Sequence, residues 1–161
     1  MYESEVINLI KSEVAFMGTI DDNRPRVRPM KPYIDNEGHI WLFSRYDSKK
    51  VLNLLQNPRI ELCFLGKEQQ VLSIYGRIKD ETKFGSPAFQ VLRDMMLHDI
   101  PEMKHYFKDK NQDSLIIYRV IVHEIRYTKP DCELTTRVNL PMEHDPDIDL
   151  AMCQGGFCLE S

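Results

Sequence analysis

The chain has 161 residues, of which 42% are hydrophobic and 29% are charged, and its formal net charge at pH 7 is -4. A chain of this length buries enough apolar surface to fold as one domain without a disulfide or a structural metal. The composition excludes a disordered or fibrous protein, and the negative charge provides no general attraction for nucleic acid or an anionic membrane.

The N-terminal segment and the cysteines predict a protein of the reducing cytoplasm. The segment MYESEVINLIKSE carries charges throughout and lacks the basic flank and apolar stretch of a secretory signal. No run of residues approaches the ~20 apolar residues that a membrane-spanning helix needs. The four cysteines are too few and too irregularly spaced for the disulfide framework of a small secreted protein.

The first elements expected along the chain are a helix and a strand. Residues 3–12 place apolar side chains at helical spacing in a polar segment, which predicts a short amphipathic helix. Residues 14–20 form a β-favouring run that ends at the turn residues Asp21, Asp22 and Asn23, so we expect a strand there.

A hairpin is expected next, over residues 26–44. Residues 26–34 are extended, because Pro29 and Pro32 prevent a helix and leave the strand at a sheet edge or irregular. The turn sequence DNEG then leads into a third strand over residues 39–44.

A helix and a second hairpin follow. Either Asp47 or Ser48 can cap a helix that runs to about Gln56. Residues 59–65 alternate apolar and polar side chains, and residues 71–78 form another β-rich run after a polar turn.

The rest of the chain predicts more helix, one long strand and a tail. Residues 81–107 are expected to form one helix and a helical tail, and residues 114–127 a central strand. Six strands joined mainly by short turns favour an α+β protein with an antiparallel sheet that closes into a barrel. We therefore expect a barrel domain over residues 1–130 and a C-terminal arm or tail over residues 131–161.

Chemistry is indicated by two lysines in the first turn of the predicted helix. Lys49 and Lys50 stand where exposed backbone N–H groups already carry partial positive charge, so further cations are unfavourable there. A phosphate would resolve this conflict by gathering the helix N-terminus, both lysines and the hydroxyl of Ser44 or Ser48 around itself.

Two arginines can complete such a phosphate site. Arg26 and Arg28 are two residues apart on one predicted strand, so both point to the same face and can form a bidentate clamp. Each of these cations taken alone is ordinarily a solvated surface group. Their combination with the helix start is what predicts a site.

These residues also carry a resemblance to a known family. The segments RPRVRPMKP and HIWLFSRYDSKKVLNLLQNPRIELCF resemble the FMN-binding core of the pyridoxamine 5'-phosphate oxidase-like proteins, most closely their general-stress and nitroimidazole-reductase branches. The match covers roughly residues 10–80. It implies an FMN-binding split β-barrel with six antiparallel strands, and a homodimer that holds FMN between its subunits.

The resemblance implies roles for individual residues. Arg28 would bind the FMN phosphate, and Pro29 and Met30 would lie along the isoalloxazine edge. The remaining positions implied in cofactor binding are Phe43, Ser44, Lys49, Lys50 and Gln70, with Lys50 the stronger match of the lysines and Gln69 an alternative to Gln70.

The C-terminal segment departs from the true oxidases of the family. Those enzymes end in an arginine- and histidine-bearing segment with a tryptophan and a terminal proline, whereas this chain ends in CELTTRVNLPMEHDPDIDLAMCQGGFCLES. Oxidation of pyridoxamine phosphate is therefore not expected, although the flavin core is retained.

Cysteine and histidine patterns add little to this interpretation. Cys153 and Cys158 flank two glycines at a spacing that permits a reversible disulfide or a metal site, but free thiols are the expected state. The histidines lack paired ligand spacing, so no metal site is expected.

The function expected is that of an FMN-dependent oxidoreductase. Electrons would pass from a reduced nicotinamide through FMN to a small acceptor such as a nitroaromatic, a quinone or a flavin. Two alternatives stay open: binding of haem or deazaflavin in the same fold, and a non-enzymatic flavin-storing or redox-sensing dimer.

Overall fold

The computed structural model describes residues 3–45, 47–83, 86–107, 115–130 and 135–138. The helices are α1 (Glu3–Ser12), α2 (Lys49–Gln56), α3 (Pro87–Asp99) and α4 (Lys104–Phe107), with a 3-10 turn η1 (Pro101–Met103) between the last two. The strands are β1 (Ala15–Asp21), β2 (Arg24–Met30), β3 (Tyr33–Ile34), β4 (Ile40–Arg45), β5 (Arg59–Leu65), β6 (Val71–Lys83), β7 (Leu115–Thr128) and β8 (Thr135–Arg137).

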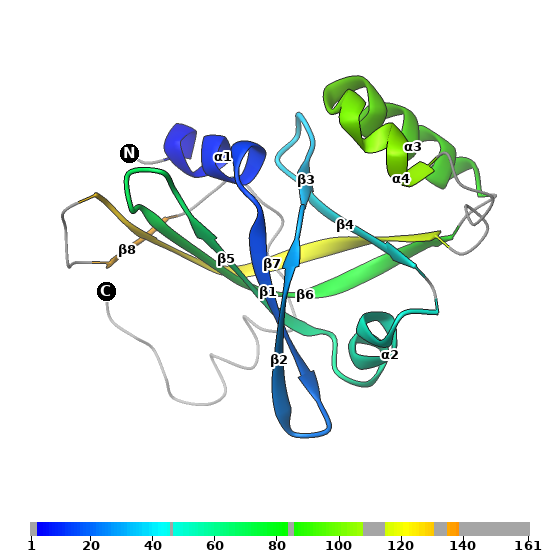
Figure 1. Ribbon diagram of the computed structural model, residues 1–161, viewed down its shortest axis with the longest axis horizontal. Helices are drawn as coiled ribbons and strands as arrows, with labels where there is room; N and C mark the ends of the chain where they lie inside the picture. The colour runs from blue at the N-terminus through cyan, green and yellow to red at the C-terminus, as the bar shows by residue number, and fades with distance from the viewer. Residues whose placement is uncertain (1–2, 46, 84–85, 108–114, 131–134, 139–161) are drawn as a thin grey trace.

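The strands form one curled antiparallel sheet with helices at its periphery (Figure 1). Their order is β2-β1-β5-β6-β7-β4-β3, and β8 pairs with the C-terminal end of β7. The predicted α+β split barrel is confirmed, with eight strands in the described sheet in place of the six expected. The two extra strands are β3 and β8, which are too short to show an apolar repeat in the sequence.

The first predicted hairpin is wrong in its pairing. β2 pairs along its whole length with β1, and only Tyr33 and Ile34 of β3 pair with β4. The two turn residues between β1 and β2, Asp22 and Asn23, have φ angles of 48° and 65°. Such left-handed pairs match the twist of a two-residue hairpin, which is why the chain reverses there. β2 ends the strand order, as its prolines predict.

Asp35 stabilises the tight turn between β3 and β4. Its buried carboxylate accepts hydrogen bonds from the backbone N–H groups of Glu37 and His39, at 3.0 and 2.9 Å, and from the indole of Trp41 at 3.0 Å. Gly38 completes the turn with a φ of 87°, which a residue with a Cβ adopts only with strain. This turn returns the chain to β4.

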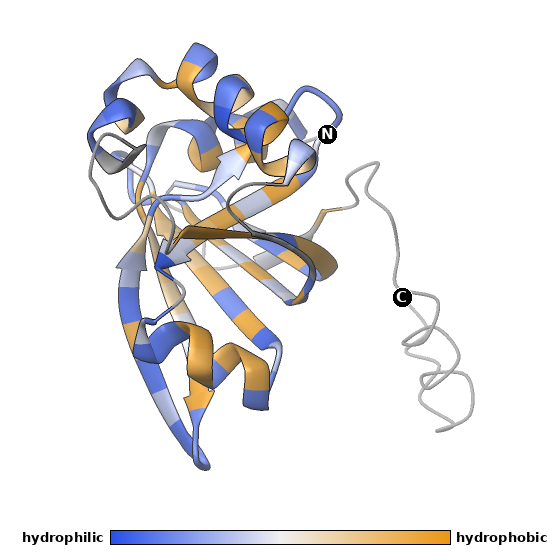
Figure 2. Ribbon diagram, turned by 90° about the vertical axis from the view of Figure 1, so that its right-hand side faces the viewer, coloured by the Kyte–Doolittle hydropathy of each residue, from blue (hydrophilic) through white to orange (hydrophobic). Residues whose placement is uncertain are grey.

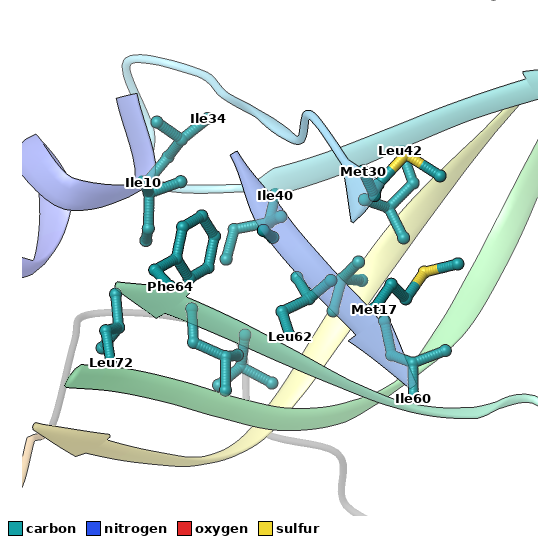
Figure 3. Close-up of a cluster of buried hydrophobic side chains, with 14 of the residues drawn as sticks. Ile10, Met17, Met30, Ile34, Ile40, Leu42, Ile60, Leu62, Phe64 and Leu72 are labelled. Atoms are coloured by element: carbon teal, nitrogen blue, oxygen red, sulfur yellow. The ribbon is translucent and has the colours of Figure 1, made fainter. Parts of the chain in front are cut away.

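The core lies inside the curled sheet and is closed at one end by α1. Figure 2 shows hydrophobic and hydrophilic residues alternating along the strands. In β5 this alternation buries Ile60, Leu62 and Phe64, as predicted from the sequence. Figure 3 shows Ile10 of α1 directed toward Phe64. Burial of each such side chain stabilises the fold by roughly 1.5 to 3 kcal/mol.

A second apolar cluster attaches α3 to the sheet. Phe89 and Met96 of α3 are fully buried and belong to one cluster with Tyr33 and Ile117. The hydroxyl of Tyr33 also donates a hydrogen bond of 2.5 Å to the Asp99 carboxylate at the end of α3. These contacts hold the segment α3–η1–α4 beside β3 and β4.

β7 is the central strand that the sequence predicts, since β6, β4 and β8 all pair with it. The ladder between β6 and β7 shifts register next to Gly76. A Cβ at Gly76 would lie 2.2 Å from the carbonyl oxygen of Ile121, so only glycine allows this close approach.

The predicted helical segment after β6 begins later than expected, because β6 continues to Lys83. Ser86 then caps α3, and Pro87 occupies its first turn. Within the described ranges no helix is long and apolar enough to cross a membrane. The tail residues Cys153 and Cys158 lie outside the described residues, and the domain boundary at residue 130 stays a prediction.

Candidate functional site

A cavity of about 450 Å³ opens where the end of β2, the end of β4 and the start of α2 meet. Its wall combines apolar groups with hydroxyls and cations. The lining residues include Pro29, Met30, Phe43, Ser44, Lys50 and His105. The cavity therefore contains five of the eight residues that the sequence assigns to cofactor binding.

Two serines form the polar floor of the cavity. Ser44, at the end of β4, is 9% exposed, and its Oγ lies 3.1 Å from the Oγ of Ser48. Ser48 is the N-cap of α2, because its Oγ accepts the N–H of Val51 at 3.4 Å. Asp47, the alternative cap, instead forms an ion pair with Arg45. The hydroxyls thus stand directly at the positive end of α2.

Arg28 of β2 is not a lining residue of the cavity; it contacts α2 through Asn53, and its hydrogen bonding is incomplete. Its Nη2 donates a hydrogen bond of 3.3 Å to the side-chain oxygen of Asn53. Its Nη1 is buried and has no hydrogen-bond partner in the described part of the chain. Burial lowers the pKa of Arg28, and the neighbouring charge of Arg26 lowers it further. A buried guanidinium N–H without an acceptor is costly, and a bound anion would supply that acceptor.

Lys50 brings a second positive charge to the same place. Its burial lowers the pKa of its ammonium group, and the charge of Arg28 lowers it further. No ion pair joins Lys50 or Arg28 to a carboxylate among the residues described. These two partly buried cations form a local positive site in a chain of negative net charge, although the Asp21 carboxylate offsets part of the Arg28 charge.

Lys49 and Arg26 lie outside the cavity, although the sequence suggests them as part of the cradle. The Nζ of Lys49 is 3.4 Å from the Asp21 carboxylate, and its side chain is 68% exposed. Arg26 reaches the same carboxylate at 4.0 Å. Asp21 therefore draws both of these cations toward the turn between β1 and β2.

Gln70 is also separate from the cavity. It lies in the turn between β5 and β6, where its Oε1 accepts the N–H of Glu68 at 3.0 Å. It lines another cavity, against Leu9 of α1. Gln69 occupies the same turn, with a φ of 65°.

The sequence analysis does not identify several residues at the site, among them His105, Asn53 and Lys31. His105 of α4 lines the cavity, but no motif marks it. Asn53 follows Lys50 by three residues on α2, and this spacing puts both on one helix face. Lys31 also lines the cavity, and its Nζ donates to the carbonyls of Ile10, Lys11 and Glu13 at the end of α1.

The arrangement can bind a flat ligand that bears a phosphate. A phosphate accepts hydrogen bonds from hydroxyls, a guanidinium and an ammonium, and it gains further from a helix N-terminus. Pro29, Met30 and Phe43 supply an apolar wall beside these donors. Such a combination of apolar surface and a few convergent polar groups is typical of cofactor sites.

Comparison with known proteins identifies a matching family. Residues 4–128 match the family model described as pyridoxamine 5'-phosphate oxidase. No curated protein matches the chain.

Solved structures share the fold at low sequence identity. General Stress Protein 26 from Bacillus anthracis str. Sterne is 13% identical, with a TM-score of 0.66 over 86% of this chain and 100% of its own. A NimC/NimA family protein from Clostridium acetobutylicum is 18% identical, with a TM-score of 0.64 over 86% and 94% of the two chains. A heme binding protein from Mycobacterium smegmatis is 13% identical, with a TM-score of 0.64 over 85% of this chain and 56% of its own.

Proposed function

The chain belongs to the pyridoxamine 5'-phosphate oxidase family, and on this premise we propose that it is a flavoprotein that holds FMN between β2, β4 and α2. The observation that carries the proposal is the buried Arg28 Nη1, which has no partner among the described residues and stands near Lys50. A phosphate supplies the acceptor that this guanidinium lacks.

Residues in the cavity wall, together with Arg28 beside Lys50, would hold the two ends of FMN. Arg28, Lys50 and the hydroxyls of Ser44 and Ser48 would hold the phosphate, since all are donors near the start of α2. Pro29, Met30 and Phe43 would lie against the isoalloxazine ring and exclude water from it.

When bound, FMN supplies the ability to accept a hydride or electrons and pass them on, which makes an oxidoreductase the favoured activity. A reduced nicotinamide is the proposed donor, and a small nitroaromatic, quinone or flavin the proposed acceptor. The cavity residues would position and polarise the ring. Lys31 would keep the end of β2 fixed through its three bonds to α1.

We propose a homodimer formed by the outer face of the sheet. Phe16, Leu65, Val71 and Tyr75 share this face, and each is at least 37% exposed. An apolar patch of this kind on adjacent strands is typical of an interaction surface. Gln70 precedes Val71 in the sequence and so lies next to this patch. Any contact of Gln70 with the isoalloxazine ring would therefore be made from the partner subunit.

Haem is the second candidate ligand. His105 lines the same cavity and would supply an imidazole ligand for the iron, and one structural neighbour is named as a heme binding protein. Haem propionates could also accept from Arg28 and Lys50. The phosphate ligand is favoured because two hydroxyls and a helix N-terminus converge beside these cations.

The absorption spectrum of the purified protein tests the proposal. FMN gives flavin bands and about one FMN per chain after reconstitution, whereas haem gives a Soret band. Riboflavin, which lacks the phosphate, should bind more weakly than FMN. Equal affinity for FMN and riboflavin would contradict the phosphate site, and absence of turnover with reduced nicotinamide would favour the storage or sensing role.

A further inference from the structure

We propose that Asn53 is a positioning residue of the phosphate site: a buried, uncharged acceptor that orients the Arg28 guanidinium without adding a negative charge beside it. The proposal rests on the proposed function, because it concerns the site where the FMN phosphate would bind. It assigns a role to a residue that does not line the cavity itself.

Asn53 is placed where a polar side chain needs a specific reason. It is 2% exposed, between the buried side chains of Val51 and Leu54 in α2. Its side-chain oxygen accepts the Nη2 of Arg28 at 3.3 Å. Burial of an amide is unfavourable unless it is hydrogen-bonded, so this contact ties the helix to the arginine of β2.

The contact fixes the direction of the guanidinium. A guanidinium is a planar fork, so holding one terminal nitrogen restricts the other. Nη1 is the nitrogen that stays buried without a partner in the described residues. An arginine held in advance loses less conformational freedom when an anion binds.

The neutrality of Asn53 matters as well as its hydrogen bond. An aspartate of the same shape would bind Arg28 more strongly and would cancel its charge. Lys50 lies one helical turn before Asn53, so a carboxylate there would also act on Lys50. Asparagine supplies the acceptor while both cations remain available to a phosphate.

Asn53→Asp is the direct test, because it changes the charge with little change in shape. We expect FMN affinity to fall at least about tenfold, because the new carboxylate repels the phosphate and neutralises Arg28. Riboflavin affinity should change by less than about twofold. Asn53→Ser keeps a neutral acceptor and should lose less FMN affinity than Asn53→Asp.

Asn36→Asp is the matched control, since it adds the same charge at an exposed position in the turn between β3 and β4. It should leave FMN affinity within about twofold of the parent. Fluorescence titration gives the affinities. Thermal denaturation with and without inorganic phosphate gives a readout that does not depend on the flavin.

The outcomes separate this proposal from the proposed function. If the parent fails to bind FMN but is stabilised by inorganic phosphate, and Asn53→Asp abolishes that stabilisation, the flavin function is wrong and the role of Asn53 stands. Equal losses of FMN and riboflavin affinity would show a merely structural residue and overturn the proposal. Unchanged FMN affinity and phosphate stabilisation in Asn53→Asp would overturn it as well.

Discussion

Lys49→Ala and Lys50→Ala are predicted to have different effects, although the two lysines are adjacent in sequence. Lys50 lines the cavity and is partly buried near Arg28, whereas Lys49 is exposed and bound to Asp21. A charge-assisted contact to phosphate contributes about 1.5 to 3 kcal/mol. Lys50→Ala should therefore weaken FMN binding roughly 10- to 100-fold, and Lys49→Ala less than about twofold.

The apo protein provides the second half of this test. Burial lowers the pKa of Lys50 and the charge of Arg28 lowers it further, so removal of one cation relieves an unfavourable interaction. Lys50→Ala should accordingly melt close to the parent temperature while its FMN affinity falls. Titration of flavin fluorescence beside thermal denaturation measures both quantities. Equal dissociation constants for the two variants would refute the assignment of Lys50 to the phosphate.

Three further predictions concern stability and assembly. Tyr33→Phe removes the hydrogen bond to Asp99 and should lower the unfolding free energy by about 1 kcal/mol. Because that bond lowers the pKa of Asp99, its contribution is present above pH ~4 and is lost as the pH falls through the folded-state pKa, so melting curves of variant and parent should converge in acid. Gly76→Ala should destabilise by about 1 to 3 kcal/mol in chemical denaturation, since its Cβ meets the Ile121 carbonyl, and a wild-type midpoint would contradict that clash. Phe16→Glu should convert the proposed dimer to a monomer in light scattering, whereas Val91→Glu, at an exposed position of α3, should not. A dimer in both variants would show that this face of the sheet is not the dimer interface.

Much of the fold could be predicted because local patterns decide it. The α1 range, the α2 cap region and the alternation of β5 each follow from spacing within a few residues. The pairing of β2 could not be predicted in the same way, since its prolines and charges give no apolar face. The choice of β1 as its partner depends on two left-handed turn residues, Asp22 and Asn23.

The candidate site likewise combines residues that local patterns predict with residues that they do not. Sequence spacing places Lys50 at a helix start and Ser44 at a strand end, and both lie in the cavity. The different positions of Lys49 and Lys50 depend on Asp21, which reaches Lys49 from another turn. His105 arrives from α4 through the packing of α3, so no local pattern could have indicated it.

The pairing of β4 with β7 has a consequence for how the protein reaches its native state. Most neighbouring strands in the sheet come from short hairpins, but Ser44 pairs with Ile116 across more than two-fifths of the chain. Closure of so long a loop loses chain entropy before any contact compensates for it, so this pairing is expected late in folding. Phe43 and Ser44 reach the cavity wall only when β4 has docked. Partly folded chains would therefore lack the proposed ligand site, and a ligand present during refolding would act only after this pairing, by trapping the completed barrel.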